Sequence, residues 1–250
     1  MFVFGAVVAS FVGVLVARLN TGQSFSVGRS TCDACGAPLA FFSLIPIVSF
    51  LAGGGRAHCC GARISVLAPL TELLLGFLFA LSYFTLGPTL LLAPFLLSLS
   101  LLLALVLYDL AHQILPLSLL IIFVSASAIV GFLSSLSVTE FSRTFFVAVA
   151  MAAFLALIHF LSRGRAMGLA DAPLVFGLSL LVGSAALPGF IFSFWIGAVI
   201  GILILAQRPR GSRMGVEVPF APYLAAGFLL AYFTQWNPFI FVANLSLTTF

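Results

Sequence analysis

Long apolar runs with almost no charge dominate this chain of 250 residues and exclude most soluble folds. Hydrophobic residues make up 63% of the sequence and charged residues 6%, whereas a soluble domain carries about 25% charged residues. About 20 apolar residues suffice to cross a bilayer as a helix. Eight runs approach that length, near residues 2–17, 66–86, 89–108, 114–133, 143–162, 172–187, 189–206 and 217–235. The sequence therefore predicts an all-α polytopic membrane protein with about eight transmembrane helices in a lipid bilayer.

One sizeable polar segment divides the chain. Residues 18–65 are predicted to form a loop that carries all four cysteines, between a first transmembrane helix (residues 1–17) and a transmembrane core (residues 66–250). The first run has neither a basic n-region nor a clear small-x-small cleavage site, so we expect a retained helix rather than a signal peptide.

The arginines predict the orientation. The chain has ten of them, no lysine and a formal net charge of +4. If eight helices alternate, all but one arginine fall on the same side: Arg18, Arg29, Arg56, Arg63, Arg163, Arg165, Arg208, Arg210 and Arg213. Only Arg143 falls on the other side, so the positive-inside rule puts residues 18–65 in the cytoplasm and both ends of the chain outside. Basic and aromatic residues do not interleave as on a nucleic-acid surface, and we expect no nucleic-acid partner.

The cysteines of the loop are spaced like ligands of a structural zinc ion. Cys32 and Cys35 form a Cys-x-x-Cys turn followed by glycine, and Cys59 and Cys60 are adjacent. We predict a zinc staple for a loop too small to build its own core. His58 is an alternative fourth ligand to Cys59. Reduced thiols without metal, or a disulfide if the topology were inverted, are the alternatives to zinc.

Two aspartates at the ends of apolar runs are candidate catalytic residues. Asp109 ends the third run and Asp171 opens the sixth, so the predicted topology puts both at the cytoplasmic membrane surface. Ionisable residues at such depth are costly and usually functional. Two neighbouring carboxylates can share one proton, so that one activates a water while the other protonates a carbonyl. The alternative is that each aspartate marks or caps a helix end.

The remaining polar residues near the membrane have simpler explanations. Glu72 is expected to pair with Arg63 or with a loop amide. His112, three residues after Asp109, is expected at the interface, and His159 is expected to be a packing histidine.

Several motifs, in order along nearly the whole chain, resemble the bacterial type IV prepilin peptidase family. Residues 5–19 are similar to its G-S-F opening, and residues 29–39 and 44–49 to its R-S-x-C-P-x-C-G and L-I-P-L-x-S stretches. Residues 60–65 and 69–73 follow in the expected order. Residues 168–171 resemble its Gly-x-Gly-Asp motif, and residues 218–223 its P-F-G-P segment. Asp109 falls on the family's first catalytic aspartate, ahead of Leu115-Pro116, and Asp171 on its second. Ala170 replaces a motif glycine, Leu117 replaces an aspartate, and Ala57 stands where the family has a cysteine.

The resemblance implies an aspartic endopeptidase of the bacterial inner membrane. It would cleave leader peptides from type IV prepilin or pseudopilin precursors at the cytoplasmic face. Some family members also N-methylate the new N-terminus with S-adenosylmethionine, although no nucleotide-type glycine loop is visible here. The rival interpretations are a small ion or proton-coupled transporter that uses the same aspartates, and an inactive assembly factor. A proton-relay carboxylate is expected in mid-span, and the intact pair of aspartates argues against an inactive protein.

Overall fold

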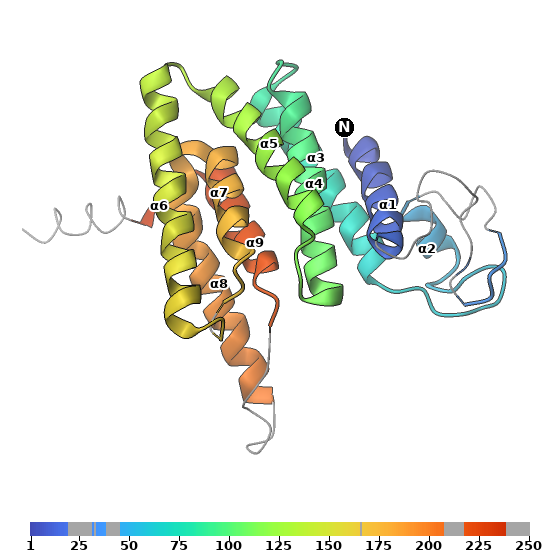
Figure 1. Cartoon of the computed structure of the whole chain (residues 1–250). Coiled ribbons are helices and arrows are strands. Elements are labelled where there is room, and N and C mark those ends of the chain that lie inside the picture. The colour runs from blue at the N-terminus through green and yellow to red at the C-terminus, as the bar shows by residue number, and fades with distance from the viewer. Residues whose placement is uncertain (20–31, 33, 39–45, 166, 208–217, 239–250) are drawn as a thin grey trace, which may run out of the picture. The chain divides into compact units, whose positions relative to one another are not determined.

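The structure is a computed structural model that describes residues 1–19, 32, 34–38, 46–165, 167–207 and 218–238 (Figure 1). Within these residues the secondary structure is helical, apart from one isolated antiparallel bridge between Arg56 and Arg63. The elements are α1 (Phe2–Arg18), α2 (Val48–Ala52), α3 (Leu67–Leu86), α4 (Leu92–His112), α5 (Leu117–Ser134), α6 (Val138–Ser162), α7 (Asp171–Val182), the 3-10 turn η2 (Gly183–Ala185), α8 (Ala186–Gln207) and α9 (Ala221–Thr234). The predicted all-α fold is confirmed.

Every predicted span corresponds to one apolar helix, in the predicted order. Among the described residues, five segments can cross a membrane by length and composition: α3, α4, α5, α6 and the continuous stretch of α7, η2 and α8. The apolar helices α1 and α9 are shorter, with 17 and 14 residues. The chain is therefore a multi-pass membrane protein.

The break between the sixth and seventh spans lies earlier than predicted. We expected the helix to continue to residue 187, but α7 ends at Val182 and Gly183 adopts a φ of 59°. A left-handed backbone ends a helix and favours glycine. Pro188 sits in the first turn of α8, where proline is tolerated.

The chain forms two compact units, Met1–Leu107 and Tyr108–Phe250, here called the N-terminal unit and the C-terminal unit. In the N-terminal unit α1 packs on α3 through small residues. A Cβ on Gly5 would lie 2.7 Å from the Leu75 carbonyl oxygen, and one on Gly76 would lie 2.9 Å from that of Phe2. Small residues let helices in a membrane approach closely and pack by van der Waals contact.

The C-terminal unit is built around α7, which is buried along nearly its whole length and packs on α5, α6 and α9 (Figure 1). A helix that is apolar all round belongs in the interior of a bundle. Glycines again set the close crossings: Gly177 of α7 faces the ring of Phe123, and Gly131 of α5 faces the Leu180 carbonyl. The most buried helix of this unit is thus the one that Asp171 opens.

The loop before α6 ends in a capping box. Ser137 is the N-cap of α6, and its hydroxyl accepts from the Glu140 N–H at 3.2 Å. The Glu140 carboxylate in turn accepts from the Leu136 N–H at 2.9 Å. Such reciprocal bonds satisfy the free donors of a helix start, which gives Glu140 a structural role.

Candidate active site and cysteine cluster

Asp109 lies in the last turn of α4 and is buried, with 6% of its surface exposed. Its Oδ2 accepts a hydrogen bond of 3.2 Å from the backbone N–H of Ala221, 112 positions further along the chain. Ala221 is the first residue of α9, so its N–H is one of the donors that a helix start leaves free. The helix dipole also favours a negative charge there. The segment at residues 218–223 thus supplies a partner for Asp109 through its backbone.

Asp171 is the first residue of α7 and is 7% exposed. Ala170 takes the N-cap position, and no side chain caps this helix end by a hydrogen bond. The Asp171 carboxylate instead accepts from the backbone N–H of Gly168. A Cβ on Gly168 would lie 3.4 Å from Asp171 Oδ2, so the bare backbone packs directly against the carboxylate. Asp171 therefore does not serve as the cap that the simpler interpretation assumed.

The fold brings these two aspartates together. They lie near enough to interact electrostatically, and they are the buried acidic side chains of the C-terminal unit within its described residues. Each is held by a backbone N–H from a different segment. Like charges on two interacting carboxylates disfavour the ionisation of both together. The arrangement is suited to acid–base chemistry on a substrate carbonyl.

His112 does not contact either carboxylate in the described interactions. It is exposed at the end of α4, and its ring packs on Tyr108 with centroids 4.5 Å apart.

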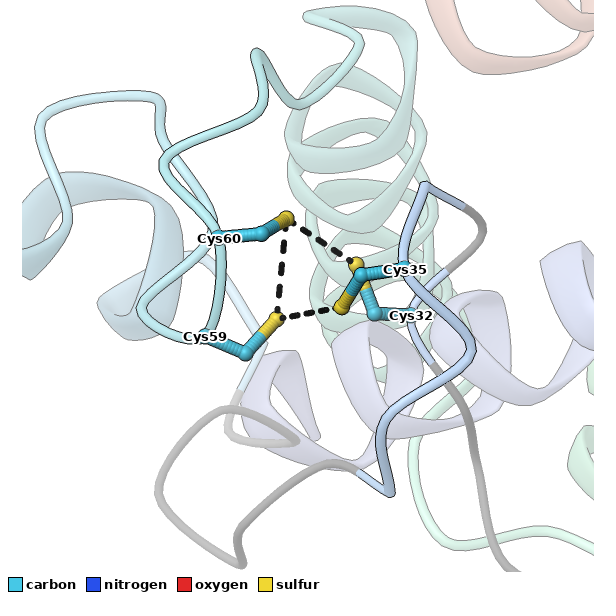
Figure 2. A group of neighbouring side chains, drawn as sticks. All are labelled: Cys32, Cys35, Cys59 and Cys60. Carbon is cyan, nitrogen blue, oxygen red and sulfur yellow. Dashed lines mark hydrogen bonds between the residues drawn. The ribbon is translucent and has the colours of Figure 1, made fainter.

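The four cysteines of the N-terminal unit form a single cluster (Figure 2). Their sulfurs all lie within 4.8 Å of one another. The Sγ–Sγ distances are 3.8 Å for Cys32–Cys60, 3.4 Å for Cys35–Cys59 and 3.8 Å for Cys59–Cys60. A tetrahedral zinc ion with Zn–S bonds of about 2.3 Å places its sulfurs about 3.8 Å apart. The donor set therefore fits a zinc ion.

Two backbone turns of the same form carry these sulfurs, at residues 32–37 and 57–62. In each turn the N–H of the first residue donates to the carbonyl of the sixth, at 2.9 and 2.8 Å. The N–H of the fifth residue donates to the carbonyl of the first, at 2.8 Å in both. The fifth residue is a glycine with a φ of 70° or 72°, a conformation that L side chains rarely adopt. The chain thus builds the same ligand-bearing turn twice.

The second turn departs from the first at one cysteine. Ala57 stands in the place of Cys32, as the comparison of motifs predicted, and Cys59 contributes its sulfur from two positions further on. The Cys35 thiol still donates to Cys59 Sγ, so the displaced residue reaches the cluster. His58 lies elsewhere: its Nε2 is 3.5 Å from the position of a Cβ on Gly53.

The thiols of the cluster differ in acidity. The pKa of Cys32 falls to about 7, mainly because the backbone N–H groups of Ala34 and Cys35 donate to its sulfur. The pKa of Cys59 rises to about 12, because hydrogen bonds with the Cys35 and Cys32 side chains favour its protonated form. A metal ligand must be deprotonated, so backbone donors that stabilise a thiolate favour metal binding.

Glu72 joins the polar loop to α3. Its carboxylate is 8% exposed and accepts the backbone N–H of Ile47 at 2.7 Å, so the expected partner is a loop amide. Ile47 has a φ of 62°, a strained conformation for a β-branched residue. A charged acceptor makes one of the stronger protein hydrogen bonds and holds this turn. Arg29 and residues 39–45 of the same loop, as well as Glu217, lie outside the described residues.

Comparisons with known proteins identify the family. The family profile described as "Bacterial Peptidase A24 N-terminal domain" matches residues 3–86. A prepilin leader peptidase/N-methyltransferase of Bacillus subtilis is 33% identical over 233 residues, which cover 93% of this chain and 92% of the relative. The protein of the same name from Myxococcus xanthus is 36% identical over 84% of this chain, which spans 64% of its length. One from Klebsiella pneumoniae is 34% identical, covering 75% of this chain and 86% of the relative. No solved structure matches the chain.

Fold and site together define a class: multi-pass helical membrane proteins with a cluster of four cysteines and a buried pair of aspartates. Within that class, the chain belongs to the prepilin leader peptidase/N-methyltransferase family.

Sequence reasoning missed the backbone donors of the site. The donor to Asp109 is an Ala221 N–H, and the donor to Asp171 is a Gly168 N–H. Both residues lie in motifs that the resemblance singled out, at 218–223 and 168–171. Because every residue type except proline carries this donor, the residue types alone could not assign the role.

Proposed function

We propose that this chain is an aspartic endopeptidase that cleaves leader peptides from type IV prepilin or pseudopilin precursors, with Asp109 and Asp171 as its catalytic residues. The observation that carries the proposal is the meeting of two buried carboxylates from separate helices. The curated relatives bear the name of this activity over most of the chain. The transporter alternative has no such support.

The reaction follows from a proton shared by the pair. The ionised carboxylate takes a proton from a water molecule, whose oxygen bonds to the carbon of the scissile carbonyl. The protonated carboxylate gives its proton to the carbonyl oxygen. The resulting tetrahedral intermediate then breaks its C–N bond. The first carboxylate gives its proton to the leaving amine, and the second carboxylate takes a proton back from one hydroxyl of the intermediate as the C=O bond reforms. Two products and the starting protonation state of the pair result.

The backbone donors orient the two carboxylates for these steps. The N–H of Ala221 holds one oxygen of Asp109, which leaves the other oxygen for the water or the shared proton. The N–H of Gly168 does the same for Asp171. Because proton transfer requires hydrogen-bond distances, fixed carboxylates are more effective than mobile ones.

The cut is proposed to occur at the cytoplasmic face of the bacterial inner membrane. The arginine pattern places the loops that follow α1, α6 and α8 on that side. Asp109 and Asp171 lie at helix ends and not in mid-helix, as cleavage near a membrane surface requires.

Cys32, Cys35, Cys59 and Cys60 are proposed to hold a structural zinc ion. Four thiolates leave no open coordination position, so the ion would stabilise the loop and not activate water. N-methylation of the new N-terminus with S-adenosylmethionine rests on the names of the relatives alone, and no residue is assigned to it.

Co-expression with a candidate prepilin tests the proposal. The parent chain should convert the precursor to a faster-migrating mature form on a gel, with the mass of the protein after leader removal. A variant with both Asp109→Asn and Asp171→Asn should leave the precursor intact. Equal processing by the parent and this variant would contradict the proposed function.

A further inference from the structure

His159, in the last turn of α6, contacts the loop that leads to Asp171. Its Nδ1 lies 2.8 Å from the carbonyl oxygen of Met167. A carbonyl only accepts, so Nδ1 must carry the proton. The imidazole ring has two further neighbours. Gly164 lies beside it, since a Cβ on this glycine would be 3.3 Å from the ring Cε1, and the ring of Phe160 packs against it edge-on with centroids 5.5 Å apart. The histidine thus holds a defined orientation.

The carbonyl that His159 binds belongs to the same peptide unit as the N–H of Gly168. A trans peptide is planar and directs its C=O and its N–H to opposite sides. On one side the Met167 carbonyl accepts from His159, and on the other the Gly168 N–H donates to the Asp171 carboxylate. A Cβ on Gly168 would lie 3.4 Å from Asp171 Oδ2, and the Asp171 N–H donates to the Gly168 carbonyl at 3.3 Å. One rigid plane therefore connects the imidazole to the carboxylate.

The neighbouring loop bonds do not replace this contact. In the turn after α6, backbone hydrogen bonds join Arg163, Gly164 and Arg165 to the end of that helix. Those at the start of α7 run from Asp171, Ala172 and Leu174 back to the preceding three residues. Among the described contacts, the His159 side chain is what ties the Met167–Gly168 peptide to α6.

We propose that His159 is a positioning residue for Asp171: its Nδ1–H fixes the tilt of the Met167–Gly168 peptide plane, which then presents the Gly168 N–H to the catalytic carboxylate. The inference rests on the proposed role of Asp171. Hydrogen bonds in a chain also polarise one another, so the imidazole strengthens the donor at the far end of the plane. Misplacing a reacting group by about 1 Å can cost about 100-fold in rate.

The test compares two substitutions at this position in the purified full-length chain, with a prepilin as substrate. His159→Phe keeps an aromatic ring without the donor, whereas His159→Asn places an amide N–H near the position of Nδ1. We expect His159→Phe to lower kcat about tenfold, as for the loss of one hydrogen bond, with KM within about twofold of the parent. His159→Asn should recover kcat to within about threefold. His112→Phe is the matched control and should stay near the parent rate.

The outcomes separate this inference from the proposed function. If Asp171→Asn abolishes cleavage but His159→Phe cleaves like the parent, positioning by His159 is wrong and the peptidase proposal stands. Equal losses of kcat in His159→Phe and His159→Asn would also overturn it, because the donor would then not matter. If Asp171→Asn itself still cleaves, the proposed function fails first. A His159→Phe variant that does not fold leaves the inference to be judged by whether His159→Asn retains the parent kcat, and a tenfold loss there would refute it.

Discussion

The two compact units hold their reactive side chains in opposite ways. In the N-terminal unit, three of the four cysteines are exposed on turns of a polar loop, and their sulfurs contact one another. In the C-terminal unit, both aspartates are buried at helix ends and depend on backbone N–H groups from other segments.

The difference reflects what each group needs. A metal site needs several donors converging on one point, and the metal–ligand bonds then stabilise the segment that carries them. A carboxylate at membrane depth instead needs hydrogen-bond donors, because its charge is costly away from water. The comparison predicts that substitutions of the aspartates leave the zinc content of the N-terminal unit intact, and that substitutions of the cysteines leave the C-terminal unit folded.

The largest effect is expected from the aspartates. Asp109→Asn or Asp171→Asn removes a group that can take up or give a proton while keeping the shape of the side chain. Cleavage of a prepilin should fall at least about 100-fold, the lower end of what general acid–base catalysis contributes. Zinc content and stability in detergent should match the parent, which metal analysis and thermal unfolding can measure. An Asn variant that processes prepilin at near-parent rate removes that aspartate from the mechanism.

The converse substitution is Cys32→Ser. The purified parent should carry about one zinc per chain, and this variant should lose most of it because oxygen is a weak replacement for a thiolate. The loop should become more susceptible to proteolysis, while the C-terminal unit, including α7, remains folded. Mass spectrometry of the metal and limited proteolysis are the measurements. Absence of zinc from freshly purified parent that has met no chelator would refute the zinc proposal.

A smaller effect distinguishes the two candidates for the fourth ligand. The sulfur of Cys59 lies within the cluster, whereas the imidazole of His58 lies beside Gly53. Cys59→Ser should therefore speed the loss of zinc to a chelator, and His58→Ala should leave that rate close to the parent. The opposite ranking would show that His58 rotates into the site when the metal binds.

The smallest signal is expected from a labelling experiment that tests on which side of the membrane residues 18–65 lie. A membrane-impermeant thiol reagent applied to intact cells should not label Cys35 or Cys59, although both are exposed on the loop. Permeabilised cells treated with a zinc chelator are the positive control. Labelling of intact cells would place the loop outside, and cleavage at the cytoplasmic face would have to be abandoned.

Much of the architecture could be predicted from the sequence. The eight apolar runs corresponded to eight helices because a lipid-facing segment must satisfy its backbone internally, and helix length follows from bilayer thickness. The helix end at Val182, which the left-handed Gly183 follows, was missed. Glycines recur throughout the sequence, and only packing shows which of them ends a helix.

The cysteine cluster was also accessible from the sequence, since short turns with a glycine after the last cysteine determine where their sulfurs point. Even the substitution of Ala57 for a cysteine was visible in the order of residues. That Cys59 still reaches the other sulfurs could not be read there, because it depends on how one turn faces the other.

The sequence by itself determined which residues could carry chemistry: four cysteines in paired turns, and two aspartates at the ends of apolar runs. Only the tertiary structure decided that the two aspartates interact and that the Ala221 N–H donates a hydrogen bond to Asp109. It also decided that His159 hydrogen-bonds to the Met167 carbonyl, close to Asp171. The physical reason is that ligand-bearing turns are set by local backbone conformation, whereas the hydrogen-bond donor to the buried Asp109 comes from a segment far away in the chain. Such partners are backbone groups common to nearly every residue, and packing alone selects which of them is used.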